Sequence, residues 1–231
     1  MSKIGIIGAM ELEVDALKAQ LTDASVTKKA GMEFHEGKLS GKDVVVVQCG
    51  IGKVNASLCV QVLADLFAVT HIINTGVAGS LNAKLDIGDI LVSREAVHHD
   101  VDVQIFGYAP GEVPGIGFRE FKADTAMVEK ALALCARETD FHAIPGRVVS
   151  GDQFISDSAV KDRLISVFAG DCAEMEGASI AQGAYLNGLP FLILRAISDK
   201  ADGSAEQDYP TFERTAARRC ADLVQKLVAE L

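Results

Sequence analysis

The sequence contains no tryptophan, and aromatic residues make up only 6% of its 231 residues. Proteins that bind single-stranded nucleic acids stack bases on clustered aromatic side chains, and such platforms are scarce here. Lysine and arginine number 22 against 32 aspartates and glutamates, which gives a formal net charge of −10. Because binding to a phosphate backbone depends on clustered basic side chains, we expect no nucleic-acid partner.

The five cysteines are odd in number, widely spaced and free of any Cys-x-x-Cys pair. They are Cys49, Cys59, Cys135, Cys172 and Cys220. We expect reduced thiols in an apolar core, which a chain of this length can build without disulfides.

Long apolar runs are absent as well. No stretch approaches the roughly 20 residues that a membrane helix needs. The N-terminus also lacks the longer apolar core and the small-residue cleavage site of a signal peptide. We therefore expect a cytoplasmic protein without a membrane partner, folded as a single domain over residues 1–231.

Known metal and nucleophile motifs are missing too. The run His98-His99-Asp100 places neighbouring side chains on opposite faces of a strand, and no second cluster completes a metal-ligand spacing. There is no Gly-x-Ser-x-Gly elbow, and no cysteine lies in a nucleophile motif. We expect no bound metal.

What is present is a regular alternation of short apolar runs and helical patterns. The predicted strands are 3–8, 44–48, 71–75, 87–93, 147–150 and 191–197, and the predicted helices are 10–21, 54–67, 127–137, 180–185 and 211–231. This order predicts a three-layer α/β fold, with a central twisted, mixed and largely parallel sheet between helices. Residues 40–43 read as a hairpin turn, so at least one strand pair is antiparallel.

Three glycine-rich segments differ in what they indicate. Gly50-Ile51-Gly52-Lys53 matches a dinucleotide or phosphate loop only in part, which favours a tight strand-to-helix turn. Residues 76–79 follow a predicted strand, where small residues let the backbone approach a ligand. The Gly- and Pro-rich segment 106–117 predicts a surface loop near a site.

Acidic residues stand at two predicted helix starts. Glu13 borders the apolar stripe of its helix, although, taken alone, a plain interaction with the helix dipole is the better explanation. Glu174 and Glu176 point to one side if their segment is extended. A carboxylate at a helix start stays ionised, so it is suited to accept hydrogen bonds from ribose hydroxyls, or it simply caps the helix.

The strongest local pattern is the run from Phe191 to Asp199. Strand alternation puts Arg195 and Asp199 on one face, and so apolar a strand requires that Arg195 be paired. Glu13 and Glu176 are the expected partners. Asp199 ends the strand in the ligand-binding crevice, where burial would raise its pKa and make it a proton donor. The alternative, a capping aspartate, leaves Arg195 unexplained.

Taken together, these segments closely resemble the 5′-methylthioadenosine/S-adenosylhomocysteine nucleosidase family of the nucleoside phosphorylase/hydrolase superfamily. The matching stretches are KIGIIGAMELEV from Lys3, GIGKVNA from Gly50, INTGVAG from Ile73, FGY at Phe106, SGDQFI from Ser150, EMEGASIA from Glu174 and RAISD from Arg195. The resemblance implies a nucleoside phosphorylase-like homodimer that needs no cofactor. It further implies hydrolysis of methylthioadenosine and adenosylhomocysteine, with 5′-deoxyadenosine as a further substrate, in methionine salvage and the activated-methyl cycle.

The family pattern also assigns roles to individual residues. Glu13 would activate water, Asp199 would protonate or hydrogen-bond adenine N7, and Arg195 would orient the acids and the water. The expected substrate contacts are Phe154 stacked on the base, the backbone of Ile155 at its Watson–Crick edge, Met175 and Glu176 on the ribose, Gly79 at the pocket floor, and Met10, Ile51 and Ser198. Phe106 and Tyr209 would surround the 5′-thio substituent, partly from the other subunit. Val77 and Ser80 depart from a serine and a glycine that are common in the family.

Three other functions remain open from the sequence. A purine nucleoside phosphorylase would need positive charge for phosphate, whereas the first loop offers Glu11 and Glu13. An aminodeoxyfutalosine nucleosidase would use the same base and ribose contacts. A nucleoside-binding sensor would bind adenosine without releasing adenine.

Overall fold

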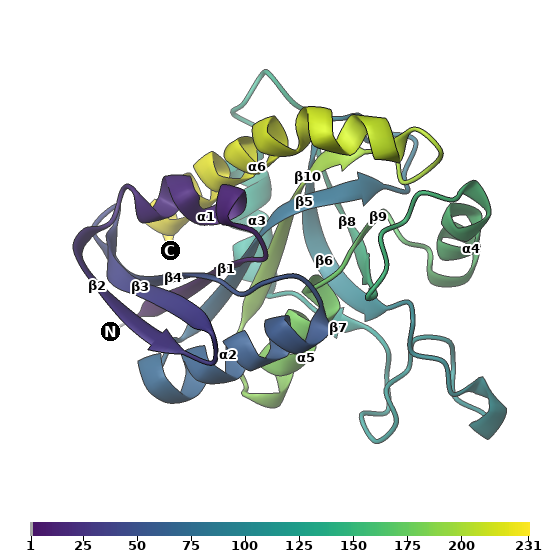
Figure 1. Cartoon of the computed structure of the whole chain (residues 1–231), viewed down its shortest axis with the longest axis horizontal. Coiled ribbons are helices and arrows are strands. Elements are labelled where there is room, and N and C mark those ends of the chain that lie inside the picture. Colours follow the sequence, from purple (N-terminus) through teal and green to yellow (C-terminus); the bar gives the residue numbers. More distant parts are fainter. Residues whose placement is uncertain (1) are drawn as a thin grey trace.

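The computed structural model describes residues 2–231, in which strands from both halves of the chain join one mixed sheet (Figure 1). The strands are β1 (Lys3–Gly8), β2 (Thr22–Lys29), β3 (Met32–Leu39), β4 (Lys42–Gln48), β5 (His71–Ser80), β6 (Ile90–His98), β7 (Phe121–Lys122), β8 (Ala143–Ser150), β9 (Cys172–Glu174) and β10 (Phe191–Asp199). The helices are α1 (Glu11–Lys18), α2 (Lys53–Phe67), α3 (Thr125–Cys135), α4 (Ser158–Phe168), α5 (Gly177–Leu186) and α6 (Ala205–Glu230), with a 3₁₀ turn at Gln104–Phe106. The expected α/β fold with a mixed, helix-flanked sheet is confirmed.

The sheet closes on itself along part of its width. Strand β5 pairs with β1 and β10 in parallel and with β9 in antiparallel orientation. Because β10 also pairs with β6, the strands β5, β9, β8, β6 and β10 form a ring, and β1, β4, β3 and β2 extend from β5. The predicted hairpin turn joins β3 to β4, with Ser40 and Gly41 both at positive φ.

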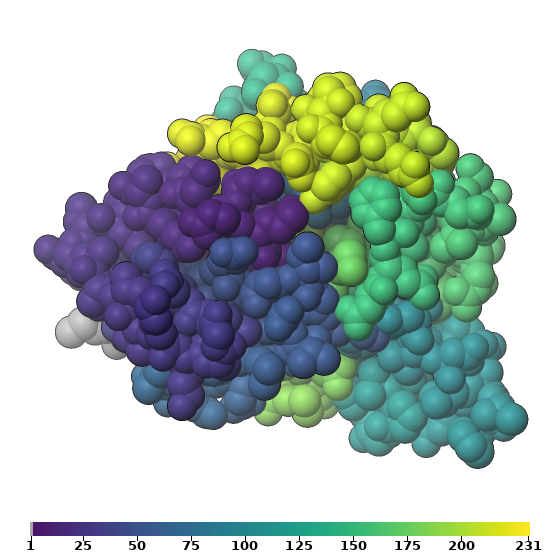
Figure 2. All heavy atoms as spheres, in the orientation of Figure 1, coloured from purple at the N-terminus to yellow at the C-terminus, as the bar shows by residue number. Residues whose placement is uncertain are grey.

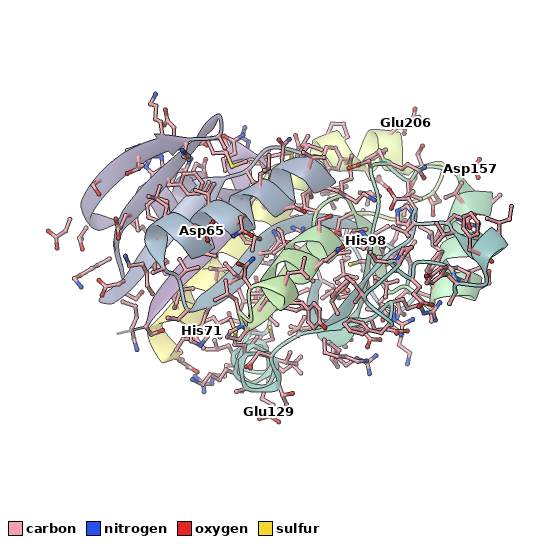
Figure 3. All side chains as sticks on the ribbon, turned by 90° about the horizontal axis from the view of Figure 1, so that it is seen from below. Asp65, His71, His98, Glu129, Asp157 and Glu206 are labelled. Carbon is pink, nitrogen blue, oxygen red and sulfur yellow. The ribbon has the colours of Figure 1, made fainter. Side chains whose placement is uncertain are left out.

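Two apolar cores lie on opposite faces of the sheet. One packs α1, α3 and α6 against it, and the other packs α2 and α5 (Figure 1). Figure 3 views the second face, where α2 and α5 lie side by side. A third, smaller apolar cluster lies beneath α4 and joins Leu164 and Phe168 to Ala201. Within residues 2–231, no helix combines the length and apolarity needed to cross a bilayer.

The structure contains elements that the sequence pattern did not predict. Residues 22–29 form β2, whose side chains are exposed along the whole strand, so no apolar alternation marks it. Helix α6 begins at Ala205 rather than near residue 211 because Pro210 is accommodated within its N-terminal turns. A third difference is β6: the sequence predicted a strand at 87–93, whereas the strand begins at Ile90 and continues to His98.

We expect replacement of Val46 by alanine to lower the free energy of unfolding by about 2–3 kcal/mol, because it removes buried methyl groups and leaves a cavity. Val46 lies on β4 between β1 and β3 and is 0% exposed. Val26→Ala on β2 is the matched control, since its side chain is 50% exposed. Urea unfolding measures both variants, and equal losses would contradict the assigned core.

Candidate active site

Polar side chains distant in the sequence converge on one pocket near the carboxyl ends of β1, β5, β9 and β10. Figure 2 shows the surface hollowed where purple and blue N-terminal atoms meet green and yellow ones. The pocket is lined by Ala9, Met10, Glu13, Ile51, Val77, Ala78, Gly79, Phe154, Ala173, Glu174, Met175, Glu176, Ser198, Asp199 and Tyr209. This crevice is where α/β sheets commonly bind ligands.

Glu13 lies in the first turn of α1, directly after the turn that leaves β1. Its Oε2 accepts hydrogen bonds from the backbone N–H groups of Ala9 (2.7 Å) and Met10 (3.0 Å), and its Oε1 accepts one from Val77 (3.0 Å). The side chain is 2% exposed. Burial raises the pKa of Glu13, while the Arg195 charge and these N–H donors oppose the rise. The result is a fixed, poorly hydrated carboxyl group, which is the environment of a general base.

Arg195 lies in the middle of β10 and is 1% exposed. Its Nη2 forms an ion pair with Glu174 and donates to Asn74 Oδ1 at 2.6 Å, while Glu176 is 3.9 Å away. Burial lowers the pKa of Arg195, but the charges of Glu174, Glu13 and Glu176 outweigh it and hold the guanidinium protonated. The expectation that Arg195 is paired is confirmed: Glu176, an expected partner, lies within ion-pair distance, Glu174 is the hydrogen-bonded partner, and Glu13 acts through its charge.

Gly76 provides the space in which this arginine approaches Glu13. A Cβ at this position would collide with Nη1 of Arg195 and with the Glu13 carboxylate. The residue has ordinary negative φ, so close approach, and not backbone conformation, requires glycine here.

Glu174 and Glu176, at the start of α5, accept hydrogen bonds from different donors. Oε2 of Glu174 accepts hydrogen bonds from the backbone N–H groups of Gly177 (2.8 Å) and Glu176 (3.2 Å), and Ser150 donates its hydroxyl to Oε1. Glu176 instead accepts from the Gly52 N–H at 2.8 Å. Burial, and then the charge of Glu174, raise the pKa of Glu176 to about 8. Glu176 is the N-cap residue of α5, but its side chain makes no capping hydrogen bond, and the side chain of Glu174 accepts the first N–H groups of the helix instead.

Asp199 ends β10 at a register irregularity. The pairing with β5 shifts between Ile197 and Asp199, so Ser198 and Asp199 both line the pocket, which strict alternation does not allow. Oδ2 of Asp199 accepts from the Ser198 hydroxyl and Oδ1 from the Ala201 N–H, each at 2.8 Å. Burial raises the pKa of Asp199, and the charges of Asp208 and Asp202 raise it further. The carboxyl group is 2% exposed and is suited to hold a proton.

Gly79 faces this carboxyl group from β5. A Cβ on Gly79 would lie 2.7 Å from Oδ1 of Asp199 and 2.9 Å from Cβ of Ala201. Small residues at 76 and 79 thus permit close approach of the protein's own side chains, and the predicted approach of a ligand to residues 76–79 stays a prediction.

Most of the other predicted contacts surround the same pocket. Met10, Ile51, Gly79, Phe154, Met175, Ser198 and Tyr209 line it, and Ile155 lines a smaller cavity of ≈ 260 Å³ that shares Phe154 and Asp199 with it. Tyr209 donates its hydroxyl to Sδ of Met10 at 3.3 Å and meets the Phe154 ring edge-on at 5.5 Å. Phe106 is the exception, since it is 76% exposed and does not line the pocket of its own chain.

Sequence reasoning missed two residues that support the arginine. Asn74 is fully buried on β5 and bridges Arg195 to the Ile7 carbonyl, and Ser150 is fully buried at the end of β8 beside Glu174. Both are polar residues within otherwise apolar strands, and that contrast was the available signal. Across residues 2–231, no three His, Cys, Asp or Glu side chains are grouped to hold a metal ion.

Comparison with known proteins identifies the family. A model of the phosphorylase superfamily matches residues 3–229. A 5′-methylthioadenosine/S-adenosylhomocysteine nucleosidase of Geobacillus sp. (strain WCH70) is 42% identical over 230 residues, which are 99% of each chain. The chain belongs to this nucleosidase family. It is accordingly an N-glycosyl hydrolase, as the sequence predicted.

Solved structures extend the nucleosidase likeness to the fold. The 5′-methylthioadenosine/S-adenosylhomocysteine nucleosidase of Neisseria meningitidis, in complex with methylthio-immucillin-A, has a TM-score of 0.97 at 36% identity and 100% coverage of both chains. The futalosine hydrolase of Helicobacter pylori strain 26695 has a TM-score of 0.94 at 34% identity, covering 100% of this chain and 98% of that one.

Proposed function

We propose that the chain, as a cytoplasmic enzyme without a cofactor, hydrolyses the N-glycosidic bond of 5′-methylthioadenosine and S-adenosylhomocysteine. 5′-Deoxyadenosine is proposed as a further substrate. The products are adenine and the 5-substituted ribose, and the reaction serves methionine salvage and the activated-methyl cycle. The observation that carries this proposal is one pocket in which two carboxyl groups are buried: Glu13, whose ionised form the Arg195 charge favours, and Asp199, whose pKa is raised.

Asp199 acts as the general acid. Cleavage of the bond leaves negative charge on the departing purine, and a proton at N7 makes adenine a neutral leaving group. A buried aspartate with a raised pKa retains a proton at higher pH than an ordinary one, and Ser198 and Ala201 fix its orientation. Phe154 stacks on the base, and the Ile155 backbone contacts its Watson–Crick edge.

Glu13 acts as the base for water. As adenine leaves, positive charge spreads over the ribose, and the carboxylates of the pocket stabilise this charge electrostatically. Arg195 holds this acidic group in place and helps to orient the water. Met175 and Glu176 contact the ribose hydroxyls, and hydrogen bonds from a vicinal diol would favour the ionised form of Glu176.

The composition of the pocket lining favours water over phosphate as the nucleophile. Glu13, Glu174, Glu176 and Asp199 line the pocket, and its lining among the described residues includes no lysine, arginine or histidine. Arg195 is not among the lining residues, and Glu174 offsets its charge. Binding phosphate here would place an anion among carboxylates without a free cation, so phosphorolysis is disfavoured.

We also propose that residues 1–231 act as one domain and pair as a homodimer. Large apolar side chains remain exposed on α2, on α5 and on the loop that carries the 3₁₀ turn, and burial of such side chains would favour association with a second copy. They are Val54, Leu58, Leu66, Tyr185, Leu186, Ile105 and Phe106. Phe106 would contact the 5′ substituent in the partner's pocket.

The function is tested by a product assay on purified enzyme with several adenosine derivatives, including a futalosine-type compound. We expect free adenine and no ribose 1-phosphate, with or without added phosphate. Asp199→Asn should lower kcat by about 10²–10⁴-fold, the usual contribution of a positioned acid. Glu13→Gln should abolish hydrolysis and still bind an inert nucleoside analogue in calorimetry.

Glu11→Gln is the matched control, because Glu11 is exposed on the same helix and pairs with Lys18. Its turnover should equal that of the wild type. Phosphate-dependent formation of ribose 1-phosphate would identify a phosphorylase instead, and preferential turnover of the futalosine-type compound would overturn the proposed substrates.

The pH profile should follow the two raised pKa values. Activity requires ionised Glu13 and protonated Asp199, so kcat/KM falls as pH decreases through the pKa of Glu13 and as it increases through that of Asp199. The acidic limb should lie above 4.5, the ordinary pKa of a glutamate, and the basic limb above 3.8, that of an aspartate. Asp208→Asn removes a charge that raises the Asp199 pKa, so it should move the basic limb to lower pH. An unmoved limb would contradict its assignment to Asp199.

The dimer is tested with Phe106→Ala, measured by sedimentation and by kinetics. Loss of an aromatic contact to the 5′ substituent should raise KM for methylthioadenosine by about tenfold, or roughly 1.4 kcal/mol. Ile165→Ala, which alters an exposed side chain on α4, is the control. A monomeric wild type, or an unchanged KM, would exclude the shared pocket.

A further inference from the structure

The carboxyl group of Asp199 depends on a strained turn that follows β10. Ala201 has φ of +51°, in the left-handed region that favours glycine, and it is 1% exposed. In this conformation its N–H donates to Oδ1 of Asp199 at 2.8 Å. An alanine holds such a conformation only where its surroundings impose it.

Lys161 of α4 contacts the turn on both sides of Ala201. Its Nζ donates to the carbonyl of Lys200 at 2.5 Å and lies 3.2 Å from Oδ2 of Asp202. The Lys161 side chain is only 21% exposed, so this contact is shielded from bulk water. One ammonium group therefore fixes the two residues that flank the strained alanine.

The rest of the turn is anchored in other directions. Oδ1 of Asp202 accepts from the N–H (3.0 Å) and hydroxyl (2.9 Å) of Ser204, next to the start of α6. Lys200 donates to the Leu85 carbonyl (2.7 Å) and to Asp86 (2.6 Å). Within this arrangement, Lys161 provides the polar link from α4.

Helix α4, which carries Lys161, is held in place by its own N-cap and by packing. Its N-cap, Asp157, accepts hydrogen bonds from the N–H groups of Ala159 (2.8 Å) and Val160 (3.0 Å). Leu164 packs in the same apolar cluster as Ala201, with Val160 against its edge. Figure 3 places Asp157 and Glu206, at the starts of α4 and α6, at the same end of the molecule.

We infer that Lys161 is a positioning residue for the proposed acid: it holds Ala201 in the left-handed conformation, so that the Ala201 N–H orients the Asp199 carboxyl group toward the substrate. This inference rests on the proposed function, since it assumes that Asp199 is the acid. Lys161 does not line the pocket and acts through the backbone of residues 200–202.

Lys161→Met tests the inference, because methionine retains an unbranched apolar stem and removes the ammonium group. We expect kcat to fall about tenfold, which corresponds to roughly 1.4 kcal/mol of transition-state stabilisation, with KM nearly unchanged. The basic limb of the pH profile should move to higher pH. Both the weakened Ala201 hydrogen bond and the unpaired charge of Asp202 raise the pKa of Asp199.

A second substitution separates positioning from general stability. Ala201→Gly, made in the Lys161→Met enzyme, should restore much of kcat and return the basic limb of the pH profile to its wild-type position. Glycine adopts positive φ readily, so it does not need the Lys161 contacts. Lys226→Met is the matched control: Lys226 also pairs with a carboxylate on another segment, Glu138, but far along α6 from the pocket. Its kinetics should equal those of the wild type.

The outcomes distinguish this inference from the proposed function. If Lys161→Met keeps wild-type kcat and pH profile while Asp199→Asn is inactive, Asp199 is the acid and the role of Lys161 is refuted. If Lys161→Met loses activity and the added Ala201→Gly restores neither kcat nor the basic limb of the pH profile, Lys161 has only a structural role. If Asp199→Asn itself turns over normally, the proposed function fails first. In the Asp199→Asn background, adding Lys161→Met should cause no further loss.

Discussion

The site depends on one buried cation surrounded by acids. Arg195 is fully enclosed in the most apolar strand of the sheet, where an unpaired guanidinium would cost several kcal/mol. Its charge is offset by Glu174 directly and by Glu13 and Glu176 at greater distance. Because each partner must be near, this pairing fixes where β5, α1 and the start of α5 lie relative to β10.

The small and polar residues around Arg195 follow from that requirement. Gly76 carries no side chain because the arginine and the Glu13 carboxylate occupy its space. Asn74 accepts a hydrogen bond from Nη2 of Arg195, and Ser150 donates one to Glu174, so each supplies a partner to a buried charged group. The same constraint makes the pocket acidic, and an acidic pocket suits a reaction in which positive charge develops on the sugar.

The sequence pattern singled out Glu13 and Arg195, but it did not predict every side chain that pairs with them. The apolar run around Arg195 predicted both the strand and a buried ion pair, and the spacing of α1 placed Glu13 at the edge of its buried face. It did not predict that Glu174 is the direct partner, because both acids of its segment satisfy the same local pattern. The irregularity near Ser198 and the exposed strand β2 were also hidden, since neither leaves a periodic signal.

Two carboxylic acids thus reach the same pocket in different surroundings. Glu13 is buried against a cation and three backbone N–H donors, which favour its ionised form and partly cancel the effect of burial on its pKa. Asp199 has two hydrogen-bond donors, and the charges that shift its pKa are those of the aspartates 202 and 208, which raise it. Burial alone would raise both pKa values alike, so the charge around each one must separate their roles. The charge of Arg195 acts on Glu13, and this asymmetry is the physical basis for proposing Glu13 as the base and Asp199 as the acid.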